Sequence, residues 1–169
     1  RPGNSSQHPA SSWGWRLRGP SARRRHACHW NCRQLAKNTS AITSIVSGSL
    51  AAGTGTPVLL NFWSSTCIPC LKEMPALEEV SEELDGAVTF IGVDVTDTVE
   101  AGREMVGRTG VTYRNARDPR GEIFAVYGGL ALPRTVLIGA DGVVLATHSG
   151  EMDADEIRSL LDENGILPS

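Results

Sequence analysis

The sequence predicts an α/β fold in which one mixed β-sheet is flanked by helices on both faces. Two apolar runs, PVLLNFW (57–63) and AVTFIGVDV (87–95), fit buried strands, and each is followed by a segment with helical features. Near the C-terminus, RTVLIGADGVVLATHSG (134–150) contains two strands joined by Asp141-Gly142, a two-residue hairpin signal. Strand–helix–strand order favours parallel pairing and a hairpin is antiparallel, so the sheet is expected to mix both.

The first strand, residues 57–63, runs almost directly into a helix. From Cys67 onward the apolar residues recur at helical spacing, so we expect a helix over residues 67–84. These apolar residues are Leu71, Met74, Leu77, Val80 and Leu84. The helix therefore starts at a cysteine.

The rest of the chain continues the alternation of strands and helices. The predicted elements are a strand over 87–95, a helix over 97–110, a short strand or loop over 111–118, a short helix over 121–129 and the hairpin over 134–150. The helix over 97–110 is expected to open on Asp97 and to stop at Gly110. The last helix has Asp153 as its N-cap, Glu156 as the capping-box partner and Gly165 as its stop.

Composition and charge divide the chain into two parts. A chain of 169 residues with 40% hydrophobic and 21% charged residues suits one globular domain. All 19 acidic residues lie after residue 50, so residues 1–50 carry a charge of +8 and the remainder −11. We expect residues 1–40 to be disordered, residues 41–54 to be a linker or the start of the domain, and residues 55–167 to be the folded domain.

The basic N-terminal segment has features of several targeting or binding sequences. It is rich in Arg and Ser, as transit peptides are, and the run Arg23 to Arg25 resembles a twin-arginine signal or a contact for anionic lipid or nucleic acid. Polar residues interrupt everything that follows, so there is no secretory apolar core and no membrane-spanning run. We expect no nucleic-acid partner, and a membrane tether only if an anchor precedes Arg1.

Two of the four cysteines, Cys28 and Cys32, lie in this segment beside His26 and His29. Such residues can bind metal, but structural zinc sites pair them with a second cluster farther along the chain, and the sequence has none. We interpret them as incidental thiols on a flexible arm. We expect no bound metal and no cofactor.

The other two cysteines, Cys67 and Cys70, form the motif CIPC. At a helix start and three residues apart, they share one face and are close enough for a disulfide. Unpaired N–H groups and the helix dipole stabilise a thiolate there, which lowers the pKa of Cys67 below the usual value of about 8.5. Pro69 occupies a position that spares a backbone N–H and stiffens the loop. Cys70, one turn inside, is expected to be more buried.

This arrangement supports thiol–disulfide exchange. Cys67 would attack a client disulfide, and Cys70 would resolve the mixed disulfide by attacking Cys67. Half of a zinc site, or a coincidence, is the other interpretation of a single CxxC, and the strand before it favours redox chemistry.

The motifs PVLLNFW, CIPC, LKEMP and ALPRTVLIGADGVV, in this order, resemble the thioredoxin superfamily and its TlpA/ResA-like branch of extracytoplasmic thiol–disulfide oxidoreductases. The resemblance covers about residues 55–167 and implies a thioredoxin fold with an extra strand and helix in residues 111–129. It also implies that Pro133 is a cis-proline beside the disulfide and that the backbone of Leu132 pairs with a bound client. Without the family, Pro133 would be an ordinary strand-entry proline. The client-binding surface is expected to include Ile68 and Pro69.

Two positions depart from the wider superfamily. Thioredoxin has an aspartate where this chain has Asn61, so Glu73, three residues after Cys70, is the candidate to accept the proton of the buried cysteine, as in the TlpA/ResA-like branch. The alternative is a surface glutamate on an acidic helix. Thr66 stands where much of the superfamily has tryptophan, so an aromatic wall beside the sulfur is missing. Phe62 and Trp63 are expected to pack in the core or under the active-site loop.

Two other functions remain open at this point. A peroxiredoxin-like peroxidase would use Cys67 with Ser64 and Arg134 as helpers. A non-enzymatic Cu(I) metallochaperone would hold the metal between Cys67 and Cys70, although copper-binding relatives use CxxxC with a distant histidine, and His148 is better explained as a strand residue.

The partners follow from the resemblance alone. It implies client proteins with disulfides or dithiols, such as an extracytoplasmic cytochrome or copper-site protein, and an upstream redox partner. It also implies an extracytoplasmic location, the periplasm or cell surface, with a cytoplasmic one as the alternative. The direction of electron transfer depends on the stability of the reduced form and is not predicted by Ile68-Pro69.

Overall fold

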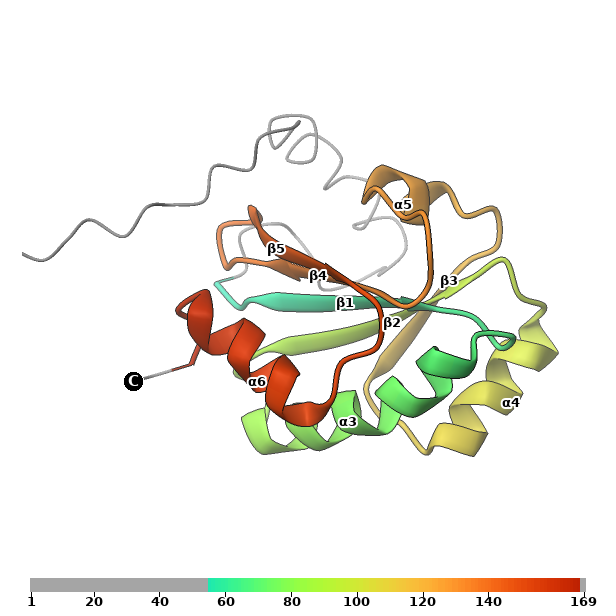
Figure 1. The fold of residues 1–169 in the computed structure, drawn as a ribbon, viewed down its shortest axis with the longest axis horizontal. Helices are drawn as coiled ribbons and strands as arrows, with labels where there is room; N and C mark the ends of the chain where they lie inside the picture. The colour runs from blue at the N-terminus through green and yellow to red at the C-terminus, as the bar shows by residue number, and fades with distance from the viewer. Residues whose placement is uncertain (1–54, 168–169) are drawn as a thin grey trace, which may run out of the picture.

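Five strands form one mixed sheet at the centre of residues 55–167, the part of the chain that the computed structural model describes (Figure 1). The expectations for residues 1–40 and 41–54, including those for Cys28 and Cys32, lie outside the described residues. The strands are β1 (Val58–Trp63), β2 (Thr89–Val95), β3 (Arg114–Asp118), β4 (Arg134–Ile138) and β5 (Val144–Ser149). The helices are α3 (Ile68–Leu84), α4 (Val99–Thr109), α5 (Glu122–Val126) and α6 (Ala154–Glu163).

The strand order in the sheet is β3-β2-β1-β4-β5. Strand β1 pairs in parallel with β2, and β2 in parallel with β3, because a helix or longer connection separates them in the chain. Strand β4 is antiparallel to both β1 and β5. The strand that leads to the CIPC motif is therefore the central one, hydrogen-bonded on both edges.

The helices cover both faces of the sheet (Figure 1). Alternate residues of β1 point to opposite faces, so Leu59 packs in a cluster with α3 and α6, while Leu60 and Phe62 pack in a cluster with α5. Trp63 belongs to a third cluster with Cys70 and residues of α4. The predicted fold class is confirmed: a mixed sheet flanked by helices, with β3 and α5 as the extra strand and helix within residues 111–129.

Helix boundaries agree with the predicted caps at two helix ends and differ at one helix start. Asp153 and Glu156 form the expected capping box of α6, and Gly110 ends α4 in the left-handed conformation. Helix α4 does not open on Asp97, because Thr98 is the N-cap and its hydroxyl accepts the N–H of Ala101. The Asp97 carboxylate instead accepts hydrogen bonds from Ser65.

The β4–β5 hairpin has a longer turn than the two-residue turn that Asp141-Gly142 predicts. The Gly139 N–H donates to the Val143 carbonyl at 2.8 Å, so three residues lie between the last bonded pair. Gly142 has φ of 80° and its N–H donates to the Gly139 carbonyl, which is a tight turn followed by a left-handed residue.

No helix within residues 55–167 has the length and apolar character needed to cross a membrane.

Candidate active site

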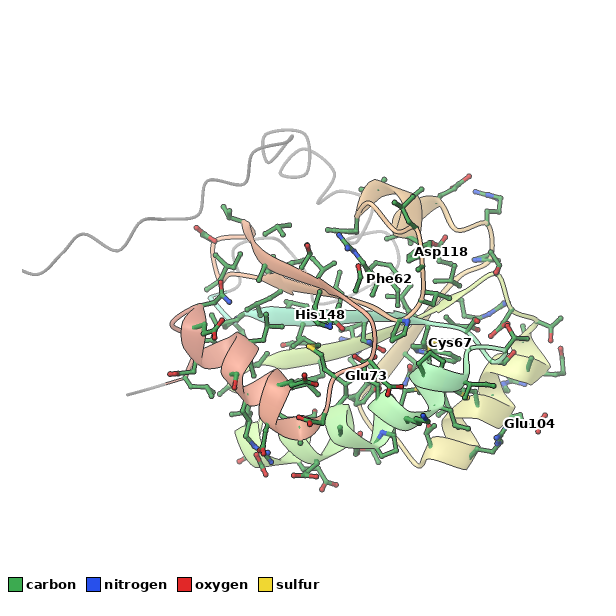
Figure 2. The ribbon with its side chains drawn as sticks, viewed as in Figure 1. Phe62, Cys67, Glu73, Glu104, Asp118 and His148 are labelled. Atoms are coloured by element: carbon green, nitrogen blue, oxygen red, sulfur yellow. A yellow bond between two sulfur atoms is a disulfide. The ribbon has the colours of Figure 1, made fainter. Side chains whose placement is uncertain are left out.

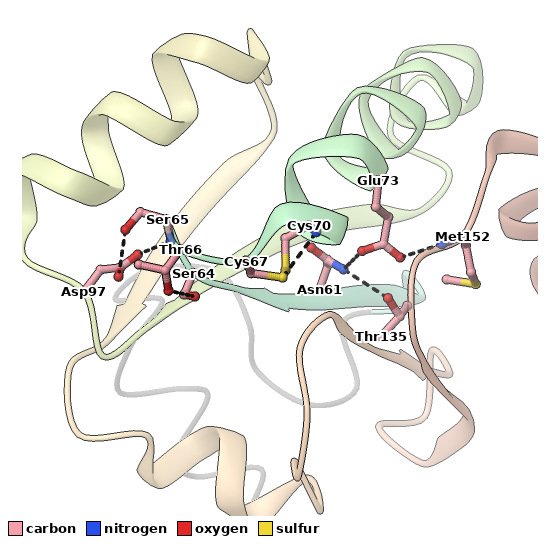
Figure 3. The surroundings of a disulfide bond; sticks show 10 residues. All are labelled: Asn61, Ser64, Ser65, Thr66, Cys67, Cys70, Glu73, Asp97, Thr135 and Met152. Atoms are coloured by element: carbon pink, nitrogen blue, oxygen red, sulfur yellow. Dashed lines mark hydrogen bonds between the residues drawn. A yellow bond between two sulfur atoms is a disulfide. The ribbon is translucent and has the colours of Figure 1, made fainter.

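Cys67 lies at the start of α3 (Figure 2) and is joined to Cys70 by a disulfide (Figure 3). Their Cα atoms are 5.3 Å apart. Cys67 is the N-cap of the helix, and its sulfur accepts a hydrogen bond from the Cys70 N–H at 3.2 Å. Cys67 is half-buried and Cys70 is fully buried, with an exposed fraction of 0%. The sulfur at the helix start is thus the accessible one, and a thiolate there would be stabilised by the same N–H group.

Glu73 lies one turn after Cys70 and is buried, with 1% of it exposed, so it is not the surface glutamate of the alternative interpretation. Its Oε2 accepts a hydrogen bond from Asn61 Nδ2 at 2.7 Å, and its Oε1 accepts the N–H of Met152 at 3.2 Å. Asn61 also donates to the Thr135 hydroxyl at 3.1 Å. In Figure 3 the Asn61 side chain lies between the disulfide and the Glu73 carboxylate.

The pKa of Glu73 is raised to about 7: burial and, to a smaller extent, the negative charge of Glu151 raise it, while the hydrogen bonds from Asn61 and Met152 act in the opposite direction. At neutral pH the carboxyl group therefore exists in both protonation states. Glu73 also lines a surface cavity of about 230 Å³ between α3 and the start of α6. The other lining residues are Lys72, Ala76, Glu151, Met152, Asp153 and Glu156. The group is thus able to exchange protons on this side of the molecule.

The expected client-binding residues come from two segments. The Leu132–Pro133 peptide bond is cis, directly before β4. Leu132 is partly buried and packs, together with Cys67, against the cluster that contains Trp63 and Cys70. Ile68 projects into solvent with 71% of it exposed, although it is apolar, and Pro69 beside it is half-buried. The structure thus brings Leu132 to the cluster beneath the disulfide and leaves Ile68 free for contact.

Ser64 and Arg134, which the peroxidase alternative would use beside Cys67, form hydrogen bonds with other residues. The Arg134 guanidinium donates to the Ser149 hydroxyl at 2.6 Å and to the Tyr127 carbonyl at 3.2 Å. The Ser64 hydroxyl lies 3.3 Å from that of Thr66.

The copper alternative relies on the sulfurs of Cys67 and Cys70, which are joined by a disulfide in this structure. His148 is a half-buried residue of β5, opposite Thr135 in the strand pairing. Within residues 55–167, no group of three or more His, Cys, Asp and Glu side chains is placed to hold a metal ion.

Several residues around the site were not identified from the sequence. Thr135 and the Met152 amide complete the surroundings of Glu73, but they are 74 residues from Asn61 and 79 residues from Glu73, respectively. Asp97 contacts the loop before Cys67 from 32 residues away. The one local signal was a polar Asn61 in an apolar strand, which indicates a buried polar partner.

A second buried carboxylate, Asp94, lies near the end of β2 and is paired with Trp63 of β1. Burial and the neighbouring Asp97 together raise its pKa to about 7, whereas Arg117 acts in the opposite direction. Gly102 on α4 leaves room for this carboxylate, because a Cβ there would lie 2.3 Å from Asp94 Oδ2. Asp94 lines a cavity of about 330 Å³ between α4 and β3.

Comparison with known proteins finds one matching family model and several similar proteins. Residues 36–163 match the family model described as Redoxin. The chain is 34% identical to thiol-disulfide oxidoreductase ResA of Bacillus thuringiensis over 63% of this chain and 62% of that protein. It is 31% identical to thioredoxin-like protein YneN of Bacillus subtilis over 68% of each. The chain thus spans about six tenths of the length of the ResA proteins it matches.

A solved structure shows the same fold. It is that of a secreted Mycobacterium tuberculosis disulfide oxidoreductase homologous to Escherichia coli DsbE. The TM-score is 0.60 at 28% identity, covering 66% of this chain and 84% of that one. The fold is therefore thioredoxin-like, and the resemblance stated from CIPC and its flanking motifs is confirmed. On the match to residues 36–163, the chain belongs to the Redoxin family.

Proposed function

We propose that the protein is a thiol–disulfide oxidoreductase that uses Cys67 and Cys70 to reduce or exchange disulfides in client proteins. The observation that carries this proposal is the disulfide between a half-buried cysteine that caps α3 and a fully buried one behind it. Relatives of the chain are named as a thiol-disulfide oxidoreductase, ResA, and as a secreted disulfide oxidoreductase homologous to DsbE.

The reduced protein would act in two exchange steps. The Cys67 thiolate attacks one sulfur of a client disulfide, and the other client sulfur leaves as a thiolate. Cys70 then loses its proton and attacks Cys67, which releases the second client sulfur. The client departs as a dithiol, and the protein keeps the Cys67–Cys70 disulfide. Two electrons pass to the client, and an upstream partner of the same chemistry must reduce the protein again.

Glu73 is proposed to accept the proton of Cys70 before the second step. A thiol as buried as Cys70 is a poor nucleophile until it is deprotonated, and water does not reach it readily. With its pKa raised to about 7 by burial, Glu73 both takes up and returns a proton near neutral pH. Asn61 and Met152 hold its two oxygens in place for this exchange.

The client would lie across Ile68, Pro69, Leu132 and Pro133. Ile68 offers an exposed apolar contact, and the backbone of Leu132 is proposed to pair with an extended client segment. The secreted relative supports an extracytoplasmic location, in the periplasm or at the cell surface. An extracytoplasmic cytochrome or a copper-site protein is the client class that this branch of relatives implies.

The test is to trap the client. Cys70→Ser leaves the mixed disulfide on Cys67 with no internal thiol to break it, so dithiothreitol-sensitive adducts should accumulate in the native host. Cys67→Ser is the matched control and should trap little. Adducts that form equally on both variants would contradict the assigned order of attack. Hydrogen peroxide turnover, or Cu(I) binding without reduction of a disulfide such as that of insulin, would favour the alternatives.

A further inference from the structure

The turn that precedes Cys67 is tied to a distant loop through one carboxylate. Residues 64–67 form a turn closed by a hydrogen bond from the Cys67 N–H to the Ser64 carbonyl, at 3.1 Å. The backbone N–H and the hydroxyl of Ser65 donate to the two carboxylate oxygens of Asp97 (Figure 3). Within residues 55–167, no other hydrogen bond joins residues 64–66 to a segment outside this turn.

Asp97 is itself held against the sheet. It lies between β2 and α4, and its carbonyl accepts a hydrogen bond from Arg117 Nη2 at 2.6 Å. Arg117 belongs to β3 and also pairs with the buried Asp94 of β2, with 3.6 Å between Nε and Oδ2. The carboxylate that receives Ser65 is therefore fixed relative to two strands.

We propose that Asp97 is a positioning residue for Cys67: by holding Ser65, it keeps the Cys67 sulfur over the first turn of α3. The inference rests on the proposed role of Cys67 as the nucleophile. Cys67 has φ of −87° and ψ of 103°, an extended conformation in which its sulfur reaches the Cys70 N–H. A turn that moves freely would take the sulfur away from that donor, and the thiolate would lose its stabilisation.

Asp97 is proposed to act on Cys67 in two opposite ways: its hydrogen bonds to Ser65 hold Cys67 in position, and its negative charge disfavours the Cys67 thiolate. A carboxylate near Cys67 by itself disfavours the thiolate, so removing the charge should speed the reaction of Cys67, and removing the hydrogen bonds should slow it. Asp97→Asn removes the charge but keeps an oxygen that accepts the Ser65 N–H and an amide that donates to the Ser65 hydroxyl. Asp97→Ala removes both. The two variants carry the same charge; Asp97→Ala additionally lacks the hydrogen bonds to Ser65 and has a smaller side chain.

The experiment measures alkylation of Cys67 by iodoacetamide in the reduced full-length protein, across about pH 5 to 9, the range in which protein thiols titrate. At neutral pH, Asp97→Ala should react roughly three- to tenfold more slowly than Asp97→Asn, the factor that corresponds to one hydrogen bond. Its Cys67 should also titrate at a higher pH. Equal rates and titration curves in the two variants would overturn the proposal.

Thr98→Ala is the matched control for the stability of α4. It removes the neighbouring N-cap without touching Ser65, so Cys67 should react at the wild-type rate. A loss as large as that of Asp97→Ala would show that loosening of α4 in general slows Cys67, and the proposal would fail.

Ser65→Ala tests the same contact from the other side, and it does so even if Asp97→Ala does not fold. It removes one of the two hydrogen bonds and keeps the charge, so Cys67 should react more slowly than in the wild type, and Ser65→Thr should restore the rate. A wild-type rate in Ser65→Ala would count against the proposal. Reduction of insulin by the wild type tests the proposed function separately, because alkylation needs no client.

Discussion

At the scale of single residues, two cysteines three positions apart have different surroundings. Cys67 is half-buried and caps a helix, whereas Cys70 is fully buried. After reduction, iodoacetamide at neutral pH should therefore label Cys67 at least tenfold faster than Cys70, since the reactive form is an accessible thiolate. Mass spectrometry of the labelled peptides measures both rates. Equal labelling, or faster labelling of Cys70, would remove the asymmetry on which the order of attack depends.

Glu73 predicts a pH dependence of stability whose sign is fixed by its raised pKa. Between its ordinary value of 4.5 and about 7, the folded protein holds a proton that the unfolded chain has released, so the free energy of unfolding falls as pH rises through this range. Glu73→Gln removes this loss. The stability of the variant relative to wild type should rise by up to about 3 kcal/mol from pH 4.5 to 8, measured by urea unfolding.

The same substitution tests the proton transfer. Glu73→Gln should slow the resolving step tenfold or more at neutral pH and remove its titration near pH 7, because glutamine accepts no proton. Glu82→Gln, at an exposed position of α3, is the control and should behave as wild type. A resolving step unchanged across about pH 6 to 9, the span in which thiols titrate, would mean that Glu73 is only structural.

The sequence identifies site residues that are close together in the chain, and it does not identify those whose contacts come from distant segments. The positions of Cys67, Cys70 and Glu73 follow from helical spacing and from the resemblance, because Cys67 caps α3 and the other two lie on it. The surroundings of Glu73 do not follow: Met152, which donates to Glu73, and Thr135, which accepts from Asn61, belong to segments that only folding brings to α3. A raised pKa likewise depends on burial, which spacing alone does not determine.

At the scale of elements, helix α5 depends on one carboxylate outside it. Asp118, buried at the end of β3, accepts the N–H groups of Glu122, Ile123 and Phe124 at 2.9–3.0 Å, because Gly121 at the N-cap has no side chain to do so. Asp118→Ala should lower the free energy of unfolding by about 2 kcal/mol, as loss of a helix cap and of buried acceptors does.

Urea unfolding measures this loss, and Asp141→Ala is the control. Asp141 is exposed and accepts one backbone N–H in the hairpin turn, so its replacement should cost less than about 1 kcal/mol. Equal effects of the two substitutions would show that Asp118 does not hold the start of α5.

The identity of the elements was easier to predict than their ends. Apolar runs and helical spacing identified the first two strands, the hairpin strands and the longer helices. The segment over 111–118, expected to be a strand or a loop, contains the strand β3. The start of α4 depends on a tertiary contact, and the length of the hairpin turn depends on hydrogen bonds within the turn itself. Asp97 and Thr98 are both good N-caps by composition, and the contact of Asp97 with Ser65 leaves Thr98 to cap α4.

At the scale of the whole molecule, residues 1–40 are predicted to contribute nothing to the folded domain. Their acid-free, aliphatic-poor composition gives too little apolar surface to offset the entropy of ordering. A shortened chain that begins at Ser40 should keep the melting temperature and the disulfide reductase activity of the full chain. A loss of more than about 1 kcal/mol in the free energy of unfolding, the typical effect of a real contact, would place the segment in the domain.

The surroundings of Glu73 have a consequence for how the protein is made. Asn61 is synthesised early and Thr135 later, and the Met152 amide becomes available only when the segment before α6 has left the ribosome and docked. Until then the nascent chain carries both cysteines but lacks the contacts that bury and hold the carboxylate. The proton transfer proposed for Glu73 would therefore be a property of the finished chain, and an incomplete chain would carry Cys67 and Cys70 without it.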